Sequence, residues 1–337
     1  MTDQASFEDR LRGQIEAYHE AALVYAAVRL GLPDRLAAGS ATGEALAETL
    51  GLSAPHLVRF LRGLCSIGVC EELPDRAFAL TPGGHSLRSG SPSRLAEKVQ
   101  IVVGQYWWPW ANVVSNLKTG QPAFEQSFGM RVSGWRAAHA EQGALFDSYL
   151  AKETLAQAGP IVTALDMSGT KRLADIGGGY GGLLAALLGA HPRLEAVLFE
   201  RPHTIEAAQR FLETLGIARR VQFVAGDVLA AIPVQADLYL LNGVLQQWSD
   251  DAARTILRNC RAAMPERARL AIIERLSPER ATDDPAAIML DLHMMTITGG
   301  RARSLPEFET LLSGTGLALS KVTLTSAGLS LLEITSQ

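Results

Sequence analysis

The apolar positions of this chain follow two different spacings, and the change falls near residue 170. Before it, apolar residues recur every three or four positions in short segments, which predicts amphipathic helices over residues 21–37, 42–52 and 53–68. Two short runs of strand-forming residues then lie on either side of a turn signal at residues 74–75. The first ninety residues are therefore predicted to form helices followed by a β-hairpin.

After this change, short apolar runs alternate with segments of helical length, which predicts parallel strands joined by crossover helices. The predicted strands are residues 171–176, 194–200, 220–229, 236–242 and 268–274, and the predicted helices are residues 183–192, 204–216 and 250–264. The chain ends differently, because a helix over residues 304–316 precedes two strands that are separated only by residues 326–328. Such a short gap makes a hairpin, so the last strand is expected to be antiparallel, unlike in the ordinary dinucleotide-binding fold.

Three parts are expected along the chain: a mostly helical, winged-helix-like domain over residues 1–95, a helical segment over 96–165, and an α/β domain over 166–337. DNA binding is the usual interpretation of a winged helix. Here the expected recognition helix carries only Arg59 and Arg62, and acids in this domain are about as numerous as bases. Because phosphate neutralisation needs several Lys or Arg side chains on one face, a dimerisation or scaffold role is favoured.

The composition is that of an ordinary enzyme and argues against several classes of function. The chain has 337 residues, of which 47% are hydrophobic and 20% charged, and its net charge is −4, so no charged surface for nucleic acid or anionic membranes is expected. Charges interrupt the apolar N-terminal segment, which argues against a signal peptide or membrane span. The three cysteines form no C-x-x-C pair, which favours the cytoplasm. No residues have metal-ligand spacing, so no metal is expected.

The segment ADIGGGYGG, residues 174–182, is the strongest local signal. Gly177, Gly179 and Gly182 satisfy the G-x-G-x-x-G pattern, whose glycines let the backbone turn tightly at a strand end and approach a ligand closely. By itself the pattern suggests NAD or FAD. Asp175 argues against a dinucleotide, because a carboxylate just before the loop disfavours an anionic pyrophosphate and suits a cationic amine.

Two further acids follow successive strands. Glu200 ends the second predicted strand, about twenty residues past the loop, where it suits a hydrogen bond to a ribose diol. Asp227, in GDV after the third strand, suits an adenine amino group better than a phosphate. A ligand with an adenine, a ribose and a positively charged tail but no phosphate is S-adenosylmethionine (SAM). Together with Asp175, these acids predict a site for SAM and for its product, S-adenosylhomocysteine (SAH).

Over essentially its whole length the chain resembles the bacterial and plant O-methyltransferases of the caffeic-acid and anthracycline-tailoring type. The matching stretches are LADIGGGYG, LFERP, GDV, VLQQWSDDAARTIL, DLHMM and GGRARSLPEFETLL. The resemblance implies a class I methyltransferase domain with a Rossmann-like sheet and no metal, and a homodimer formed through a winged-helix-like N-terminal domain. It places the SAM contacts on Gly177, Gly179, Glu200, Arg201, Asp227, Val228 and Asn242. The segment FDSYLAKET resembles the family stretch F-N-x-x-M-x-x-x-S, which adds Thr154 near the methionine carboxylate.

The acceptor side is where the sequence departs from the family. In many members a His-Asp-Trp tip follows a strand of the sheet, and its histidine removes the phenolic proton of the acceptor. Here the tip reads Gln246, Gln247, Trp248. Glu274 matches one acidic partner of that histidine, whereas Ala302 replaces the other, which belongs to the family pattern G-G-x-E-R. Two of the three acid–base residues are therefore replaced.

Losing this base restricts methyl transfer without excluding it. General-base catalysis contributes about 10²–10⁴ in rate, whereas proximity and orientation can supply roughly 7–11 kcal/mol. The remaining acceptors are acidic or ionised phenols, carbon or nitrogen nucleophiles, or hydroxyls whose proton goes to water or to another side chain. The candidates for that side chain are His293, in DLHMM, and Glu274 if burial raises its pKa.

A small aromatic natural product is the expected acceptor. By resemblance, Met294 lines the acceptor pocket, and Trp248 matches the tryptophan of the tip. The aromatic run YWWPW, which includes Trp107, suits a pocket wall near a domain junction. Gln246 and Gln247 supply amides that hydrogen-bond an acceptor without deprotonating it. O-methylation is the predicted reaction, and the alternatives are C- or N-methyl transfer, a non-methylating SAM-dependent reaction such as hydroxylation, decarboxylation or rearrangement, and a DNA-binding regulator.

Overall fold

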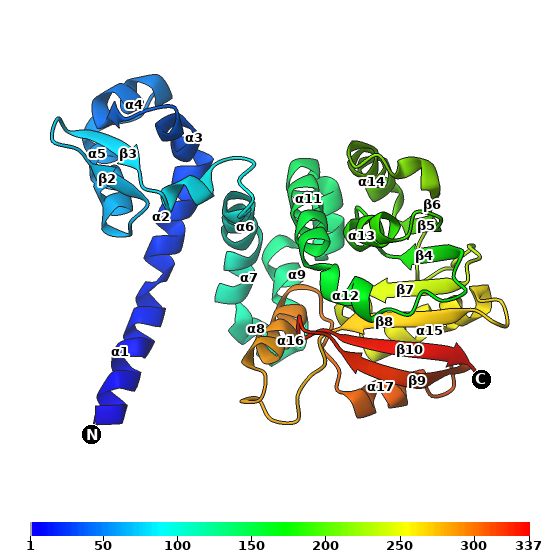
Figure 1. Cartoon of the computed structure of the whole chain (residues 1–337). Helices are drawn as coiled ribbons and strands as arrows, with labels where there is room; N and C mark the ends of the chain where they lie inside the picture. The colour runs from blue at the N-terminus through cyan, green and yellow to red at the C-terminus, as the bar shows by residue number, and fades with distance from the viewer. Residues whose placement is uncertain (1) are drawn as a thin grey trace. The chain divides into compact units, whose positions relative to one another are not determined.

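The computed structural model describes the backbone of residues 2–337 and the side chains of residues 6–337. The chain forms two compact units, Met1–Trp108 and Pro109–Gln337 (Figure 1). Among the described residues, no helix is both long enough and apolar enough to span a membrane.

The first unit is mostly helical. Its helices are α1 (Thr2–Glu16), α2 (Tyr18–Arg29), α3 (Leu32–Ala37), α4 (Gly43–Leu50), α5 (Ala54–Ser66), η1 (Gly84–Leu87) and α6 (Leu95–Ile101), followed by the π-helix η2 (Val102–Tyr106) and the start of α7 (Trp107–Ala111). Strands β1 (Ala41–Thr42), β2 (Cys70–Glu72) and β3 (Ala77–Leu80) form an antiparallel sheet in the order β1-β3-β2. The predicted helices and the β2–β3 hairpin are therefore present.

Local sequence explains two details of this unit. The segment predicted as residues 21–37 is split into α2 and α3 at Gly31, which takes a left-handed φ of 64°, and Pro33 occupies the first turn of α3. Strand β1 was not predicted, because two residues are too few to show an alternating pattern. Helix α5 buries Leu57, Leu61 and Leu64, which are four and three residues apart and so share the face that packs into the core.

The second unit begins with helices and continues as an α/β sheet. The helices are α8 (Val113–Thr119), α9 (Ala123–Phe128), α10 (Val132–Ala138), α11 (Ala140–Gln157) and α12 (Gly159–Ala164), and then α13 (Gly182–Ala190), α14 (Pro202–Thr214), η3 (Ala218–Arg220), η4 (Leu245–Gln247), α15 (Asp250–Ala263), α16 (Pro285–Ile297) and α17 (Leu305–Leu312). The strands are β4 (Arg172–Ile176), β5 (Glu195–Glu200), β6 (Val221–Ala225), β7 (Leu238–Asn242), β8 (Arg269–Glu274), β9 (Leu317–Leu324) and β10 (Ser330–Ser336).

The seven strands form one sheet in the order β6-β5-β4-β7-β8-β10-β9 (Figure 1). Neighbouring strands from β6 to β8 are parallel, whereas β10 is antiparallel to both β8 and β9, so the predicted parallel sheet with a terminal antiparallel hairpin is confirmed. This is the Rossmann-like sheet of class I methyltransferases. The strand order changes direction between β4 and β7, and open α/β sheets place their ligands at such a point, at the carboxyl ends of the strands.

Both faces of the sheet are buried, and alternation along the strands decides which residue faces which layer of helices. In β4, Leu173 belongs to the core under α13 and α14, whereas Ala174 and Ile176 belong to the core under α15 and α17. In β7, Leu240 and Leu241 divide between the two cores in the same way. Two packed faces hold the strand ends rigidly, and the site described next lies on those ends.

Candidate active site

The glycine loop after β4 passes directly over a buried acid. Gly177 and Gly179 have left-handed φ angles of 69° and 59°, which glycine adopts without strain. The backbone N–H of Gly177 donates to the carbonyl of Phe199 at 2.8 Å, which ties the loop to β5. A Cβ atom on Gly178 would lie 2.2 Å from Oδ2 of Asp175. The loop therefore needs glycine at position 178 because the Asp175 carboxylate fills the space beside it.

Two carboxylates lie together at this point. Asp175 is 1% exposed, and its Oδ1 has no hydrogen-bond partner among the described residues. Burial, and secondly the charge of Glu200, raise the pKa of Asp175 to about 7. Glu200 accepts hydrogen bonds from the backbone N–H groups of Gly179 at 3.1 Å and Arg201 at 2.7 Å, so the loop and the end of β5 hold its carboxylate in place. A cation placed beside these two acids would be stabilised by both.

The other residues predicted to bind SAM lie on or next to the carboxyl ends of neighbouring strands. Asn242 ends β7, and Asp227 and Val228 follow β6. The Oδ1 atom of Asp227 accepts from the backbone N–H of Leu229 at 2.9 Å, which fixes this side chain in its turn. Thr154 lies half-buried on α11.

These residues fit SAM. The glycine cradle gives close backbone approach, Asp175 offers a buried oxygen without a partner to a cationic amine, and Glu200 is held in position for a ribose. Their individual roles as SAM contacts stay predictions.

The titration of Asp175 gives the first testable prediction. If its carboxylate contacts the cationic end of SAM, affinity must be highest when Asp175 is ionised, which is above its pKa of about 7. We expect the Kd for SAM to be roughly tenfold higher at pH 6 than at pH 8, since about a tenth of a group with a pKa of about 7 is ionised at pH 6 and about nine tenths at pH 8. The Asp175→Asn variant, measured by calorimetry, should lose this dependence. An equal pH dependence in both proteins would contradict the assignment.

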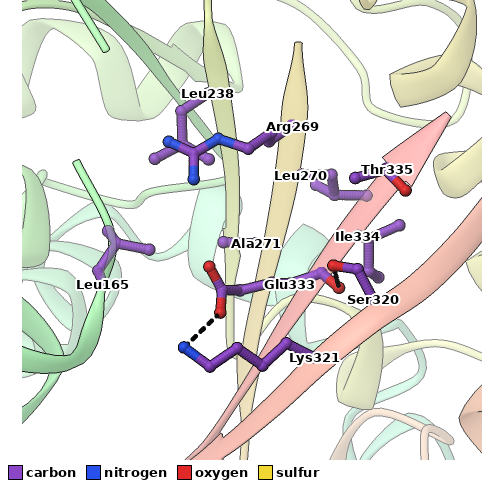
Figure 2. A pocket seen from close by; sticks show the side chains of 10 residues that line it. All are labelled: Leu165, Leu238, Arg269, Leu270, Ala271, Ser320, Lys321, Glu333, Ile334 and Thr335. Atoms are coloured by element: carbon purple, nitrogen blue, oxygen red, sulfur yellow. Dashed lines mark hydrogen bonds and ion pairs between the residues drawn. The ribbon is translucent and has the colours of Figure 1, made fainter. Parts of the chain in front are cut away.

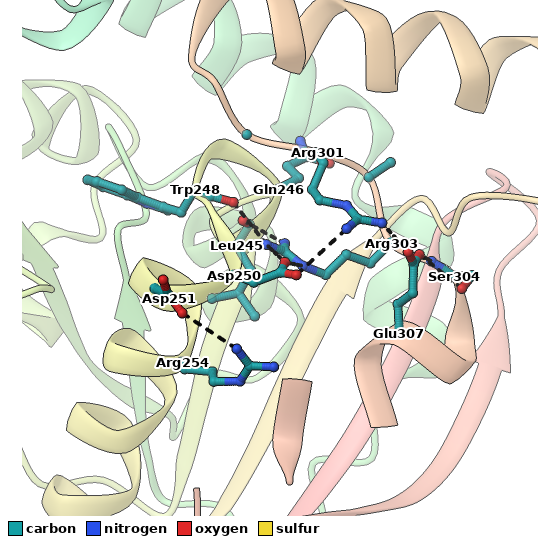
Figure 3. Close-up of polar contacts among 12 residues, drawn as sticks. Leu245, Gln246, Trp248, Asp250, Asp251, Arg254, Arg301, Arg303, Ser304 and Glu307 are labelled. Carbon is teal, nitrogen blue, oxygen red and sulfur yellow. Dashed lines mark hydrogen bonds and ion pairs between the residues drawn. The ribbon is translucent and has the colours of Figure 1, made fainter. Parts of the chain in front are cut away.

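The tip after β7 is held from two sides, and Figure 3 shows the contacts of Arg303 on one of them. Arg303 is 1% exposed, and its guanidinium donates to the carbonyls of Leu245 and Trp248, both at 2.9 Å, and to Oδ1 of Asp250 at 3.0 Å. From the other side, the Oε1 atom of Glu274 accepts from the backbone N–H of Gln246 at 2.9 Å. The tip backbone is therefore rigid, and the residue at position 246 has a fixed place.

The tip offers amides and no side chain that accepts a proton at neutral pH. Gln247 donates from Nε2 to the carbonyl of Gly243 at 2.9 Å, and Nε2 of Gln246 lies close to the same glycine. Glu274 is 1% exposed, and burial raises its pKa to about 7 against the opposing effects of the Gln246 backbone and of Arg303. Glu274 accepts from the tip backbone, which makes it a positioning residue for the tip.

His293 on α16 lies beside an indole of the aromatic run. Nε1 of Trp110 donates to Nδ1 of His293 at 3.3 Å, and the two rings stack with centroids 6.3 Å apart. Burial, and secondly the charge of Arg136, lower the pKa of His293 to about 4. The ring is therefore neutral at pH 7, and a neutral histidine that accepts at Nδ1 carries its proton on Nε2. A group in this state donates a hydrogen bond more readily than it takes a proton.

Three further residues were predicted to bind the acceptor, and the structure describes the surroundings of each. Trp107 belongs to the first unit, where its ring meets Tyr18 edge-on at 6.2 Å between centroids. Met294 follows His293 on α16 and is 9% exposed. Trp248 is half-buried and packs against the core between the sheet and α15. The acceptor-binding roles of these three residues stay predictions.

Four further residues of this region were not singled out from the sequence: Arg136, Asp147, Asp291 and Arg303. Asp291 accepts at Oδ1 from the backbone N–H of Ala302 at 2.8 Å, which joins α16 to the loop before α17. Asp147 lies in the motif FDSYLAKET and Asp291 in the motif DLHMM, so their places in motifs next to predicted site residues could have pointed to both acids from the sequence. Arg303 lies in the quoted stretch GGRARSLPEFETLL, at the arginine of the pattern G-G-x-E-R, but the stretch does not indicate that this side chain is buried. Arg136 could be found only from packing.

One cavity lies away from these residues (Figure 2). Its volume is about 210 Å³, and its wall includes Leu238 and Arg269, the first residues of β7 and β8, together with the Lys321–Glu333 ion pair at 3.2 Å. The cavity therefore lies at the amino ends of the parallel strands, opposite to the glycine loop. Among the described residues, no group of three or more His, Cys, Asp or Glu side chains is arranged to hold a metal ion.

Comparisons with known proteins agree with this geometry. The sequence model of the O-methyltransferase domain matches residues 110–318, and that of the O-methyltransferase dimerisation domain matches residues 14–88. Phenazine O-methyltransferase PhzM from Lysobacter antibioticus is 38% identical over 320 residues, which cover 95% of this chain and 93% of that protein. The solved structure of mitomycin 7-O-methyltransferase MmcR has a TM-score of 0.91 at 32% identity and covers 100% of this chain and 99% of its own.

A third relative was solved with its ligands. The O-methyltransferase NcsB1 from neocarzinostatin biosynthesis, in complex with SAM and 2-hydroxy-5-methyl naphthoic acid, has a TM-score of 0.82 at 29% identity and covers 94% of this chain and 96% of its own. The chain therefore belongs to the O-methyltransferase family that carries an N-terminal dimerisation domain, and it is a SAM-dependent methyltransferase.

Proposed function

We propose that this enzyme methylates a hydroxyl oxygen of a small aromatic natural product and that its tip takes no part in removing the proton. The observation that carries the proposal is the tip itself. By the resemblance to the family, Gln246 stands where many members have a histidine; its backbone N–H donates to Glu274, and no side chain of η4 accepts a proton at neutral pH. Methyl transfer therefore depends on how the two reactants are held.

The chain's residues supply this positioning. When bound, SAM supplies a methyl group on a positively charged sulfur; the acceptor oxygen would bond to the methyl carbon in line as the carbon–sulfur bond breaks, and neutral SAH would leave with the electron pair on sulfur. Asp175, Glu200 and the glycine loop hold the charged and ribose parts of SAM. The amide of Gln246, on a backbone locked by Arg303, orients the acceptor by hydrogen bonding. Because alignment of two bound reactants is worth roughly 7–11 kcal/mol, an orienting amide is sufficient at the tip.

The neighbouring residues favour an aromatic acceptor. The stacked rings of Trp110 and His293, centroids 6.3 Å apart, and the thioether of Met294 on the same helix offer flat and polarisable surfaces. Relatives are named for phenazine and naphthoate substrates, which are aromatic ring systems of this kind.

A panel assay tests this function. The full chain is incubated with methyl-labelled SAM and hydroxylated phenazines, naphthoates and benzoates, and both SAH and labelled product are quantified. We expect one SAH for each O-methylated product. Label on nitrogen or carbon would redirect the proposal to the corresponding methyl transfer, and a converted product without stoichiometric SAH would replace it with a non-methylating reaction.

We further propose a homodimer formed through the first unit, in agreement with the matched dimerisation domain. Helix α1 and the start of α2 expose Phe7, Leu11, Ile15 and Tyr18 at 51%, 43%, 65% and 53%. They are spaced by four, four and three residues and therefore share one face. A contiguous apolar stripe of this kind is typical of an interface.

Charges placed on the α1 stripe should break the dimer. We expect the Leu11→Asp/Ile15→Asp variant to elute as a monomer in size-exclusion chromatography with light scattering, whereas Arg12→Asp, on the same helix, should remain dimeric. A dimeric double variant would place the interface elsewhere.

The cytoplasmic location inferred from the cysteines, which are all free thiols, stays a prediction.

A further inference from the structure

The loop that leads from α16 to α17 touches the tip backbone to backbone. We call residues 298–303 of this loop the strap. An added Cβ on Gly300 would lie 2.1 Å from the carbonyl oxygen of Gln246 and 2.4 Å from the carbonyl carbon of Gln247. Gly300 is buried, and its φ lies outside the left-handed region, so the backbone conformation itself does not require glycine. Position 300 needs glycine because the tip occupies the space where a side chain would begin.

The first residues of the strap are tied to the acceptor side through Met294. The carbonyl of Met294 accepts from the backbone N–H groups of Thr298 and Gly299, both at 2.9 Å, and from the Thr298 hydroxyl at 3.0 Å. The same hydroxyl accepts from the backbone N–H of Gly300 at 3.1 Å and lies 4.0 Å from the sulfur of Met294. Thr298 therefore connects the residue that touches the tip with a residue that is predicted to line the acceptor pocket.

Other contacts keep the strap from moving by itself. Asp291 on α16 accepts from the backbone N–H of Ala302 at 2.8 Å, and Pro122, just before α9, lies 2.8 Å from an added Cβ on Gly299. At the end of the strap, Arg303 donates to two carbonyls of the tip (Figure 3). Helix α16 itself packs against η4. The strap thus joins α16 to the tip at a fixed separation.

We propose that Gly300 is a specificity-determining residue, because the contact of its backbone with the tip sets the distance between Gln246 and Met294 and so limits the bulk of the acceptor. This inference rests on the proposed function, in which Gln246 and Met294 both contact the acceptor. Without a side chain at position 300, two backbone segments approach each other as closely as they can. The narrow gap that results favours a compact, flat acceptor over one with bulky substituents.

A methyl group at position 300 would widen this gap. Contacts to a Cβ are essentially never shorter than 3.0 Å, whereas the nearest one here would be 2.1 Å, so the strap and the tip must separate by roughly 1 Å. Three hydrogen bonds hold the carbonyl of Met294 on the strap, so Met294 moves away from Gln246 together with the strap. A compact acceptor then loses contact on one side, and a bulkier one gains room.

The Gly300→Ala variant tests the proposal with two acceptors: a hydroxynaphthoate that the wild-type enzyme methylates, and the same compound with an added isopropyl group. We expect kcat/KM for the parent compound to fall about tenfold or more, and the ratio of the bulky to the parent compound to rise at least about tenfold, since one methylene in a pocket is worth about 10–200-fold. The Kd for SAH should stay within about threefold. Gly134→Ala, on α10, is the matched control, because its added Cβ meets nothing within 4 Å, and it should keep the wild-type ratio.

Variants of Thr298 give a second test that does not crowd the tip. Thr298→Val removes the hydroxyl that joins Gly300 to Met294, so it should shift the ratio in the same direction by about two- to tenfold. Thr298→Ser, which keeps the hydroxyl, should restore the wild-type ratio. This pair decides the question if Gly300→Ala does not fold.

The two acceptors separate a specificity role from a purely structural one. Equal losses with both acceptors in Gly300→Ala, or a folded Gly300→Ala variant with the wild-type ratio, would overturn the proposal. So would a wild-type ratio in Thr298→Val. In each of these cases, SAH release by the wild type with the parent compound would leave the proposed function intact. If the wild type releases no SAH with any acceptor of the panel, the function and this inference are overturned together.

Discussion

Gly178→Ala is expected to raise the Kd for SAM and SAH at least about a hundredfold, or about 2.7 kcal/mol. The added Cβ would lie 2.2 Å from Oδ2 of Asp175, and it would lie 2.4 Å from the carboxyl carbon. Asp175 is 1% exposed and lies in the sheet between β5 and β7, so it has no room to move away. Either the loop lifts from the strand end or the carboxylate rotates, and both changes disturb the cradle for SAM.

Gly189→Ala is the matched control for this prediction. Gly189 lies in α13, which begins just after the same loop, and nothing lies within 4 Å of its added Cβ. Because alanine is the better helix former by about 1 kcal/mol, this variant should bind SAH normally and unfold at a slightly higher temperature. Calorimetry with SAH and far-UV circular dichroism measure binding and folding separately. A folded Gly178→Ala variant with wild-type affinity would show that the loop does not form the SAM site.

Arg303→Ala is expected to lower the free energy of unfolding by about 3–5 kcal/mol and kcat by about a hundredfold. The guanidinium is buried and binds the carbonyls of Leu245 and Trp248 and the carboxylate of Asp250. Removing it leaves two carbonyls of the tip without this donor, at about 1–3 kcal/mol each, and opens a void in the packing. The tip then loses one of the two supports that fix Gln246.

Arg301→Ala provides the comparison on the same loop. The Arg301 side chain is 43% exposed, and it pairs with Asp250 at 3.6 Å and with Glu307 (Figure 3). Exposed ion pairs contribute about 0–1 kcal/mol, so this variant should lose at most about 1 kcal/mol in urea unfolding and should keep most of its activity. Equal losses in the two variants would mean that the buried donor contacts of Arg303 add nothing beyond an exposed charge.

Much of the second unit followed from local sequence. The parallel strands β4, β5, β7 and β8 are short apolar runs that are buried on both faces, and the gap of three residues before the last strand left only a hairpin. The glycine loop and the acids Asp175 and Glu200 were also predictable, because strand ends in a parallel sheet meet at one edge. The prediction of SAM followed from charge: an acid before the loop suits a cation.

The residues around the acceptor were harder to predict, because their surroundings depend on packing between distant segments. Arg303 becomes a buried clamp only when the loop before α17 crosses the tip 55 residues earlier in the chain. Trp110 rather than Trp107 meets His293, and the run YWWPW does not indicate which indole would do so. Asp147 sits in a motif that was used only to place Thr154, and its environment comes from α10, β5 and α14 together.

The central claim is that the tip orients the acceptor and does not remove its proton. The most direct measurement compares the pH dependence of kcat/KM for the wild type and Gln246→Ala with the same hydroxynaphthoate. We predict profiles of the same shape, with the variant lower by less than about tenfold at every pH, as expected for the loss of one hydrogen bond of about 0.5–1.5 kcal/mol. A hundredfold loss, or a profile whose apparent pKa moves, would contradict the claim and return the proton-handling role to the tip.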